Sequence, residues 1–438
     1  YNFFVADEPQ IPAWQGTPPR DMTAIKEMED AYFESNYDLT AMLKALFNSD
    51  WFKNARFEKV KSPAELVAGT AAEAESPFQA DVLIINSCTV TEEADRDVRR
   101  LIRRVVRRNQ KTEIIVTGCY AQRRPEELAA MSQVRYVVGN SHKAMVGALA
   151  QRRLEASMYD PRSEIFCSDI FSDRGLAEPA YQGAGGRTRA TIKIQDGCNA
   201  TCAFCIIPAV PGAGRSLGPE SVVGQVRDLV ERGYREVVFS GIHLGSYGRD
   251  IEPRCSLTEL VSRTLDSVPA LERLRLSSIE PLEVTPDIID RVANDSRVAT
   301  HLHVPMQSGS SRVLKAMRRP YRAPEFAALV ERIRAATPDA AIGADVMVGF
   351  PGETDDDFLM TYRLIENSSL TYLHVFPYSP RPGTAAADYP HPVPEHVSRF
   401  RGQQLRELIG RKNEAFRRRF VGRQIWVLVL DEEAKSGW

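Results

Sequence analysis

Three cysteines lie within eight residues of one another near the middle of the chain, in the stretch QDGCNATCAFCIIP. Cys198, Cys202 and Cys205 have the spacing C-x3-C-x2-C. Three thiolates can hold three corners of a [4Fe–4S] cluster and leave the fourth iron open to a substrate. A structural zinc ion needs four closed ligands, and no fourth cysteine or histidine stands nearby in the sequence. The spacing therefore favours an iron–sulfur cluster over structural zinc.

Two further cysteines each follow a short apolar run. Cys88 comes after DVLIIN, and Cys119 comes after EIIVTG. Runs of this kind are typical of buried parallel strands, and ligands bind where such strands end. The two thiols are therefore either ligands or small buried hydrophobic groups.

The cysteines need elements that position them, and the chain between Asp81 and Gly139 alternates strands and helices. We predict strands at 82–85, 114–116 and 136–138, with helices at 92–108 and 125–131. This pattern is typical of an open, doubly wound α/β sheet.

Six strand–helix units follow in the chain from residue 190 onward. Parallel units in this number predict a partial (β/α)6 barrel, with its site at the C-terminal ends of the strands. Cys198 would then lie just after the first barrel strand. The predicted strands are 190–194, 236–240, 273–277, 301–304, 342–348 and 372–376, with helices starting near Pro219, Leu257, Thr285, Pro324, Asp355 and Pro394.

Several longer motifs accompany the cysteines. They read SGIHLGSYGRD, RLRLSSIEP, HLHVPMQSGS, MRRPY, GADVMVGFPGET and HVFPYSPRPGT. From about Asp81 to Trp438 the chain resembles the radical S-adenosylmethionine (SAM) methylthiotransferases. The wording SSIEP and HLHVPMQSG is most similar to the branch that acts on N6-threonylcarbamoyladenosine at position 37 of tRNA, rather than the isopentenyladenosine and ribosomal-protein branches.

The resemblance implies a reaction and its cofactors. The cluster on Cys198, Cys202 and Cys205 would cleave SAM, and a methylthio group would enter C2 of the adenine. An auxiliary [4Fe–4S] cluster would take Cys88 and Cys119 as ligands from two of the family's three cluster-binding segments. The implied partners are tRNA and an electron donor such as flavodoxin or ferredoxin.

Residues at the ends of the barrel strands are candidates for SAM contact. The glycines could equally be ordinary turn glycines, and the GFPGE turn could be purely structural. We expect His301 and His303 to point to opposite sides of their strand, the inward one packing or hydrogen bonding. The cofactor candidates are Gly241, Gly245, Gln307, Ser308, Gly349 and Glu353.

The chain departs from the family at its start. The family's first glycine–cysteine segment is missing, because residues 1–87 contain no cysteine. Cys167 or Cys255 could replace it, although we interpret both as ordinary cysteines. The alternatives are a radical SAM protein that cleaves SAM without transferring sulfur, and an inactive metal-binding fusion product.

The expected fold class is α/β, in five parts. Residues 1–70 form a helical segment that looks foreign to the family, a candidate fusion. An incomplete methylthiotransferase N-terminal domain (71–150) and a linker (151–186) follow. The radical SAM core occupies 187–416, and 417–438 begin a truncated β-barrel RNA-binding domain.

Composition adds general limits. The formal net charge of -2 argues neither for nor against nucleic acid as a partner. No apolar run is long enough to span a bilayer, and seven cysteines without a paired framework suggest a reducing, cytoplasmic setting. Two basic runs are either solvated faces or phosphate-binding sites. They comprise Arg96, Arg99, Arg100, Arg103, Arg104, Arg107 and Arg108, and then Arg411, Lys412, Arg417, Arg418 and Arg419.

Overall fold

The computed structural model describes residues 80–425 except 90, 156–162 and 171–188, together with the isolated residues Asp30 and Val427. One compact unit spans Leu66–Leu428, and every element below belongs to it. The helical segment predicted for residues 1–70 lies outside the described residues apart from Asp30. The same holds for nearly all of the predicted β-barrel start beyond residue 425.

A parallel sheet forms the N-terminal part of this unit. Its strands follow the chain order β1 (Val82–Ser87), β2 (Glu113–Gly118), β3 (Val134–Val138) and β4 (Glu164–Phe166). The first three were predicted, whereas β4 lies in the segment expected to be a linker. The helices of this part are α4 (Glu92–Arg108), α5 (Cys119–Arg123), α6 (Pro125–Ala129), α7 (Val146–Glu155) and the 3₁₀ helix η2 (Asn140–Met145).

Helix α4 has the bounds that its sequence predicts. Thr91 caps its start by accepting a hydrogen bond from the Ala94 backbone N–H at 3.2 Å. Val98, Ile102 and Val105 recur at helical spacing and are buried against the sheet. Most of the arginines are left exposed, whereas Arg99 is partly buried and contacts Tyr120 and Glu127.

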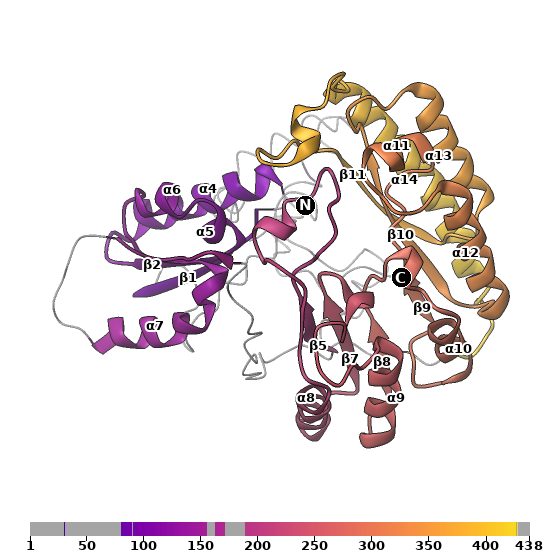
Figure 1. Cartoon of the computed structure of the whole chain (residues 1–438), viewed down its shortest axis with the longest axis horizontal. Coiled ribbons are helices and arrows are strands. Elements are labelled where there is room, and N and C mark those ends of the chain that lie inside the picture. The colour runs from indigo at the N-terminus through magenta and orange to yellow at the C-terminus, as the bar shows by residue number, and fades with distance from the viewer. Residues whose placement is uncertain are drawn as a thin grey trace. The chain divides into compact units, whose positions relative to one another are not determined.

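Six parallel strands form the partial barrel, as predicted (Figure 1). They pair in two groups of three, and isolated bridges from Leu274 to Val298 and from Ser278 to His303 link the groups. The short strand β6 (Arg215–Ser216) lies antiparallel to the end of the first one. The barrel strands are β5 (Arg189–Asp196), β7 (Glu236–Gly241), β8 (Arg273–Leu276), β9 (His301–His303), β10 (Ala341–Val348) and β11 (Tyr372–Pro377).

Helices cover the outer face of these strands, and the main hydrophobic core lies between the two layers (Figure 1). They are α8 (Pro219–Glu231), α9 (Leu257–Ser267), α10 (Pro286–Asn294), α11 (Ser311–Ala316), α12 (Ala323–Ala336), α13 (Asp355–Asn367) and α14 (Glu395–Arg418). The short 3₁₀ helices are η4 (Ile207–Ala209), η5 (Leu244–Ser246), η6 (Pro281–Glu283) and η7 (Ala385–Asp388).

Alternation along the strands separates an apolar outer face from a polar inner face. In β10, Ala344 and Val346 belong to the core, so Asp345 between them faces inward. The expectation that His301 and His303 point to opposite sides is wrong. Residues two apart on a strand share a face, and both imidazoles contact the hydroxyl of Tyr372.

Two further expectations concern the end of the chain and the membrane. Helix α14 continues to Arg418, two residues beyond the predicted end of the radical SAM core. Within the part of the chain that the structure describes, no helix combines the length and the apolar character needed to cross a membrane.

Candidate active site

The loop that carries the three clustered cysteines begins at the C-terminal end of β5. Gly197 has a φ of +69°, and a Cβ there would lie 2.0 Å from the carbonyl oxygen of Ala213. The glycine therefore permits a sharp turn that another residue would obstruct. The Cys198 backbone N–H donates to the Gly212 carbonyl at 3.0 Å, which anchors the start of the loop. The cysteines thus occupy the predicted end of the first barrel strand.

Hydrogen-bond donors point at the sulfur atoms. The Ala200 backbone N–H lies 3.3 Å from Sγ of Cys198. An Nη1 of Arg319 lies 3.3 Å from Sγ of Cys202. The Arg319 side chain is only 5% exposed and also pairs with Glu280. Burial opposes the charge on Arg319, but Tyr321, Glu280 and Cys202 together raise its pKa, so a cation lies beside the sulfur.

These residues fit a [4Fe–4S] cluster. All three thiols are partly exposed and belong to one loop. Hydrogen bonds to the sulfurs are among the features that tune such clusters. Burial raises the pKa of Cys205 to about 11, so this thiol must lose its proton as it binds iron.

His243 is a site residue that the sequence did not single out. Its Nδ1 lies 3.4 Å from Sγ of Cys198, and its Nε2 lies 2.9 Å from the carboxylate of Glu283. The hydrogen bond to Cys198, and next the bond to Glu283, raise the pKa of His243 to about 10. His243 and Arg319 lie in the motifs SGIHLGSYGRD and MRRPY, but nothing in their spacing indicates contact with sulfur.

A cavity of about 260 Å³ opens beside Cys198. Two of the glycines predicted to contact SAM belong to the same part of the chain, Gly241 at the end of β7 and Gly245 in η5. A Cβ on Gly245 would lie 2.3 Å from the Glu283 carboxylate, and a Cβ on Gly241 would lie 3.0 Å from Gln195. Protein packing therefore explains both glycines. Residues of the cysteine loop and the β7 segment line the cavity: Asn199, Ala200, Gly214, His243, Ser246, Arg249 and Asp250.

Gln307 and Ser308 follow β9 but differ in their surroundings. Gln307 has a φ of +64°, and its buried Oε1 has no hydrogen-bond partner within the described residues. A buried amide oxygen without a partner is unusual and is suited to a donor on a bound molecule. The Ser308 hydroxyl is fully buried and already accepts from the Ser310 N–H at 3.2 Å. Gln307 is therefore the better candidate of the two for contact with a cofactor.

Glu353 stabilises the turn after β10. The carboxylate accepts from the Gly349 backbone N–H and from Arg401 on α14, each at 2.7 Å. Gly349 has a φ of +77° and lies against Ser398. Burial is the main cause that raises the pKa of Glu353. These contacts favour the structural interpretation of the turn.

Cys88 and Cys119 come together at the C-terminal edge of the N-terminal sheet. Strands β1 and β2 are paired to their ends, where Ser87 lies opposite Gly118. Burial raises the pKa of Cys119, the amide of Asn140 at 3.6 Å from its Sγ opposes this, and Cys88 raises it further. The edge thus presents two neighbouring thiols to one side of the sheet.

The two remaining cysteines occupy different environments. Cys167 directly follows β4 and lies on the same sheet edge, with its Sγ 3.7 Å from the Gln122 carbonyl oxygen. Cys255 is buried in the barrel core just before α9. By position, Cys167 is the better candidate for a third ligand at the auxiliary site.

Comparison with known proteins identifies the family. Residues 192–365 match the radical SAM superfamily, and residues 58–139 match the uncharacterized protein family UPF0004. The second match begins inside the segment predicted to be foreign. The chain is 42% identical over 327 residues to threonylcarbamoyladenosine tRNA methylthiotransferase MtaB of Bacillus subtilis, covering 74% of this chain and 71% of that protein. The chain belongs to the radical SAM methylthiotransferases.

Other relatives of this methylthiotransferase are named for two different tRNA nucleosides, threonylcarbamoyladenosine and dimethylallyladenosine. MtaB of Aquifex aeolicus is 36% identical over 81% of this chain and 84% of its own length. A tRNA-2-methylthio-N(6)-dimethylallyladenosine synthase of Thermobifida fusca is 38% identical over 84% and 73%. The solved radical SAM methyltransferase TsrM of Kitasatospora setae, with cobalamin and a [4Fe–4S] cluster bound, covers 70% of this chain and 65% of its own. At 15% identity and a TM-score of 0.54, it supports the barrel fold alone.

The two basic runs differ in the contacts that their side chains make within the protein. On α4, Arg96 and Arg100 pair with Glu93, so part of this run is neutralised on the helix itself. On α14, Lys412 donates to the carbonyl oxygens of Ile365 and Glu366 at 2.7 and 2.9 Å and also to that of Ser368. Lys412 thus caps the C-terminal end of α13, a structural role that the charge run did not indicate.

Proposed function

We propose that this chain inserts a methylthio group at C2 of the N6-threonylcarbamoyladenosine at position 37 of tRNA. The observation that supports it most is the three-thiol loop at the end of the first barrel strand. It stands in a chain that is 42% identical to the Bacillus subtilis MtaB over most of both proteins. The motifs SSIEP and HLHVPMQSG favour the threonylcarbamoyl branch over the dimethylallyl branch.

The cluster and SAM would supply the radical chemistry. When bound, the cluster provides the electron that cleaves SAM to methionine and a 5′-deoxyadenosyl radical, which takes the hydrogen from C2. Cys198, Cys202 and Cys205 would hold the cluster. Arg319 and His243 would donate hydrogen bonds to two of the thiolates, and the unpartnered oxygen of Gln307 would accept one from SAM.

The sulfur source would be a second cluster on the N-terminal sheet. Cys88 and Cys119 would supply two of its ligands, and Cys167 is the candidate for the third. The partners are tRNA and an electron donor such as flavodoxin or ferredoxin. The anticodon-loop base is unpaired, which allows a barrel to take it up.

The test compares two tRNA substrates. The anaerobically reconstituted protein is incubated with SAM, a reductant and tRNA bearing either threonylcarbamoyladenosine or isopentenyladenosine, and digested nucleosides are analysed by mass spectrometry. We expect the methylthio product only from the first tRNA. A product only from the second would refute the substrate, and 5′-deoxyadenosine without either product would favour a protein that cleaves SAM but transfers no sulfur.

The Cys198→Ala, Cys202→Ala and Cys205→Ala variants are the matched controls. Each removes one of three cluster ligands, so each should abolish both 5′-deoxyadenosine and product formation. Cys255→Ala provides the comparison, because Cys255 is buried in the barrel core rather than at a strand end. Full SAM cleavage in any of the first three variants would contradict the assignment of the cluster.

A further inference from the structure

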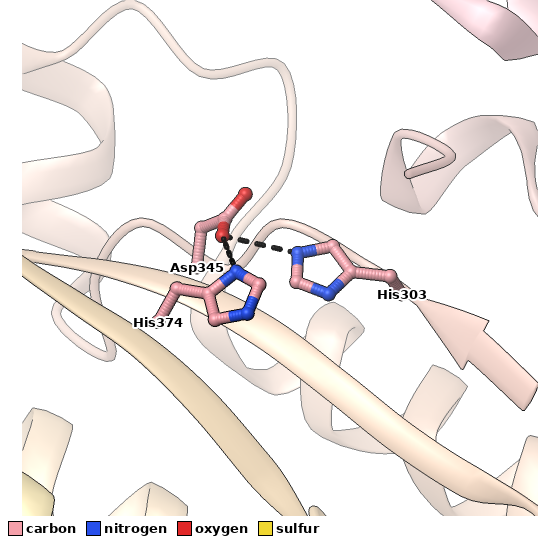
Figure 2. A group of neighbouring side chains, drawn as sticks. All are labelled: His303, Asp345 and His374. Atoms are coloured by element: carbon pink, nitrogen blue, oxygen red, sulfur yellow. Dashed lines mark hydrogen bonds and ion pairs between the residues drawn. The ribbon is translucent and has the colours of Figure 1, made fainter. Parts of the chain in front are cut away.

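A group of polar side chains lies on the inner face of the barrel, apart from the cysteines. His303 ends β9, Asp345 lies within β10 and His374 lies within β11. The three strands are neighbours in one parallel sheet, where Asp345 lies opposite His374 and Gly343 opposite His303. Figure 2 shows both imidazoles pointing toward the carboxylate of Asp345. Strand pairing thus brings together two imidazoles and a carboxylate that are far apart in sequence.

The ligand atoms converge on a small volume. Nε2 of His303 lies 3.0 Å from Oδ1 of Asp345, and Nδ1 of His374 lies 3.2 Å from the same oxygen. One ligand atom from each of the three residues lies within 4.8 Å of the others. Metal bonds of about 2.1 Å that meet at 90–110° place two donor atoms roughly 3.0–3.4 Å apart. Both nitrogen–oxygen distances fall in this range.

The cluster is reachable from solvent, since the side chains of Asp345 and His374 are 24% and 66% exposed. An ion could therefore enter and keep water on its open side.

A hydrogen bond with Tyr372 orients the ring of His303. Its Nδ1 lies 2.9 Å from the hydroxyl of Tyr372, which in turn lies 2.7 Å from Nε2 of His301. Metal-binding histidines commonly engage their second ring nitrogen in such a bond, which selects the tautomer. Tyr372 occupies this position because Gly343 leaves room for its ring; a Cβ on Gly343 would lie 1.9 Å from the ring carbon Cζ.

The tautomer of His303 differs between the metal-bound and the metal-free site. With a metal on Nε2 of His303, its Nδ1 carries the proton and donates to Tyr372. Without a metal, Nε2–H donates to Asp345 and Tyr372 donates to Nδ1. The same three residues thus make a closed hydrogen-bonded group when empty and a two-histidine, one-carboxylate ligand set when loaded.

We propose that His303, Asp345 and His374 form a binding site for one divalent transition-metal ion on the inner face of the barrel. It is distinct from the iron–sulfur centres and independent of the proposed tRNA substrate. Two imidazoles and one carboxylate suit Zn²⁺, Fe²⁺ or Mn²⁺. Three protein ligands leave positions for water or for an oxygen donor of a bound substrate.

The experiment uses the cluster-loaded full chain, so that cysteine thiols do not capture the added metal. Mn²⁺ is titrated anaerobically and followed by electron paramagnetic resonance, because oxidised [4Fe–4S] clusters are silent there. We expect about one tightly bound Mn²⁺ per chain whose pulsed spectra show nitrogen couplings from two imidazoles, and displacement by Zn²⁺. His374→Gln and Asp345→Asn should each weaken binding about tenfold or more, and Tyr372→Phe about tenfold.

His396→Gln is the control, because this exposed histidine at the start of α14 does not belong to the three-residue group. His374 is exposed as well, so its variant should fold, which cluster absorbance verifies. Lack of saturable binding would overturn the proposal. So would a bound Mn²⁺ without imidazole couplings, or affinity in His374→Gln equal to that of His396→Gln.

Discussion

Arg381 connects the barrel to the segments that carry the auxiliary cysteines. It lies after β11 with only 2% of its side chain exposed, and it donates to Thr89 and, at 2.9 Å, to Asp95. Thr89 directly follows Cys88. Arg123, on the helix that begins at Cys119, also contacts Asp95 at 3.4 Å and donates to the Pro382 carbonyl at 3.1 Å. The segments that follow Cys88 and Cys119 therefore both contact the barrel at Arg381 and Pro382.

Replacing Arg381 with methionine should loosen this connection. The variant keeps an apolar side chain of similar length but leaves Asp95, whose side chain is 7% exposed, with Arg123 as its remaining cationic partner at 3.4 Å. Removing one partner of a buried ion pair costs about 3–5 kcal/mol. Because Arg123 stays in reach, we expect a loss of about 3 kcal/mol in the free energy of unfolding.

The assay has two readouts. Denaturant unfolding of the cluster-loaded protein measures stability, and product analysis measures 5′-deoxyadenosine and methylthio nucleoside separately. Under the proposed function we expect Arg381→Met to retain SAM cleavage, which depends on the barrel cysteines, and to lose most of the methylthio transfer, which also needs Cys88 and Cys119 in place. A purely structural defect would lower both products together.

A double-mutant cycle with Asp95→Asn isolates the pair. The combined variant should be more stable than the sum of the single effects predicts, with a coupling of roughly 1–3 kcal/mol. Arg123→Met is the matched control and should cost less, since its distance to Asp95 is longer. Additive effects, together with an unchanged ratio of the two products in Arg381→Met, would refute this reasoning.

Three further outcomes follow from individual contacts. Lys412→Met should destabilise the protein by about 1–3 kcal/mol because three carbonyl oxygens lose their donor, whereas exposed Arg411→Met should lower tRNA affinity without this loss of stability. Under the proposed function, iron analysis should find about eight irons per chain, and Cys167→Ser should lower the content to about four; about four irons in the unaltered protein would contradict the second cluster. Burial opposes the charge on Asp357, yet hydrogen bonds from Arg312, Ser310 and Thr354 keep its pKa below the usual range. The stabilisation from Asp357 is then present above about pH 4 and lost as pH falls below that value, so Asp357→Asn should show a shallower loss of the urea midpoint between pH 6 and 3.

Local patterns were sufficient for most of the fold. All six barrel strands and α4 were predicted because the apolar pattern of a strand or helix extends over a few positions, whereas the cap Thr91 was recognised only in the structure. Strand β4 was missed because its three residues EIF form too short a run and are mostly exposed. Helix α5 was missed for a related reason, since it is one turn that begins at Cys119 directly after a strand.

The candidate site was predictable only where chemistry is local in sequence. The spacing of Cys198, Cys202 and Cys205 indicates their joint role, because ligands on one short loop are close however the chain folds. Arg319 reaches Cys202 only because the fold brings the segment after α11 against the loop after β5, a contact across 117 positions that no local pattern reports. Lys412 was misread for the same reason, since a charge run gives no sign of the carbonyl oxygens at the end of another helix.

The histidine–aspartate group depends on strand order rather than on spacing along the sequence. The inward one of His301 and His303 was expected to pack or hydrogen bond, and His303 does so with Tyr372. Its second role depends on strand order, because β9, β10 and β11 place His303, Asp345 and His374 on one face only if they are adjacent and parallel. Parallel neighbours with a fixed register bring inward residues at similar depth together, whatever the length of the connecting helices. A ligand set of this kind can therefore be inferred only after the sheet is known, and its occupancy is decided by metal binding in His374→Gln against His396→Gln.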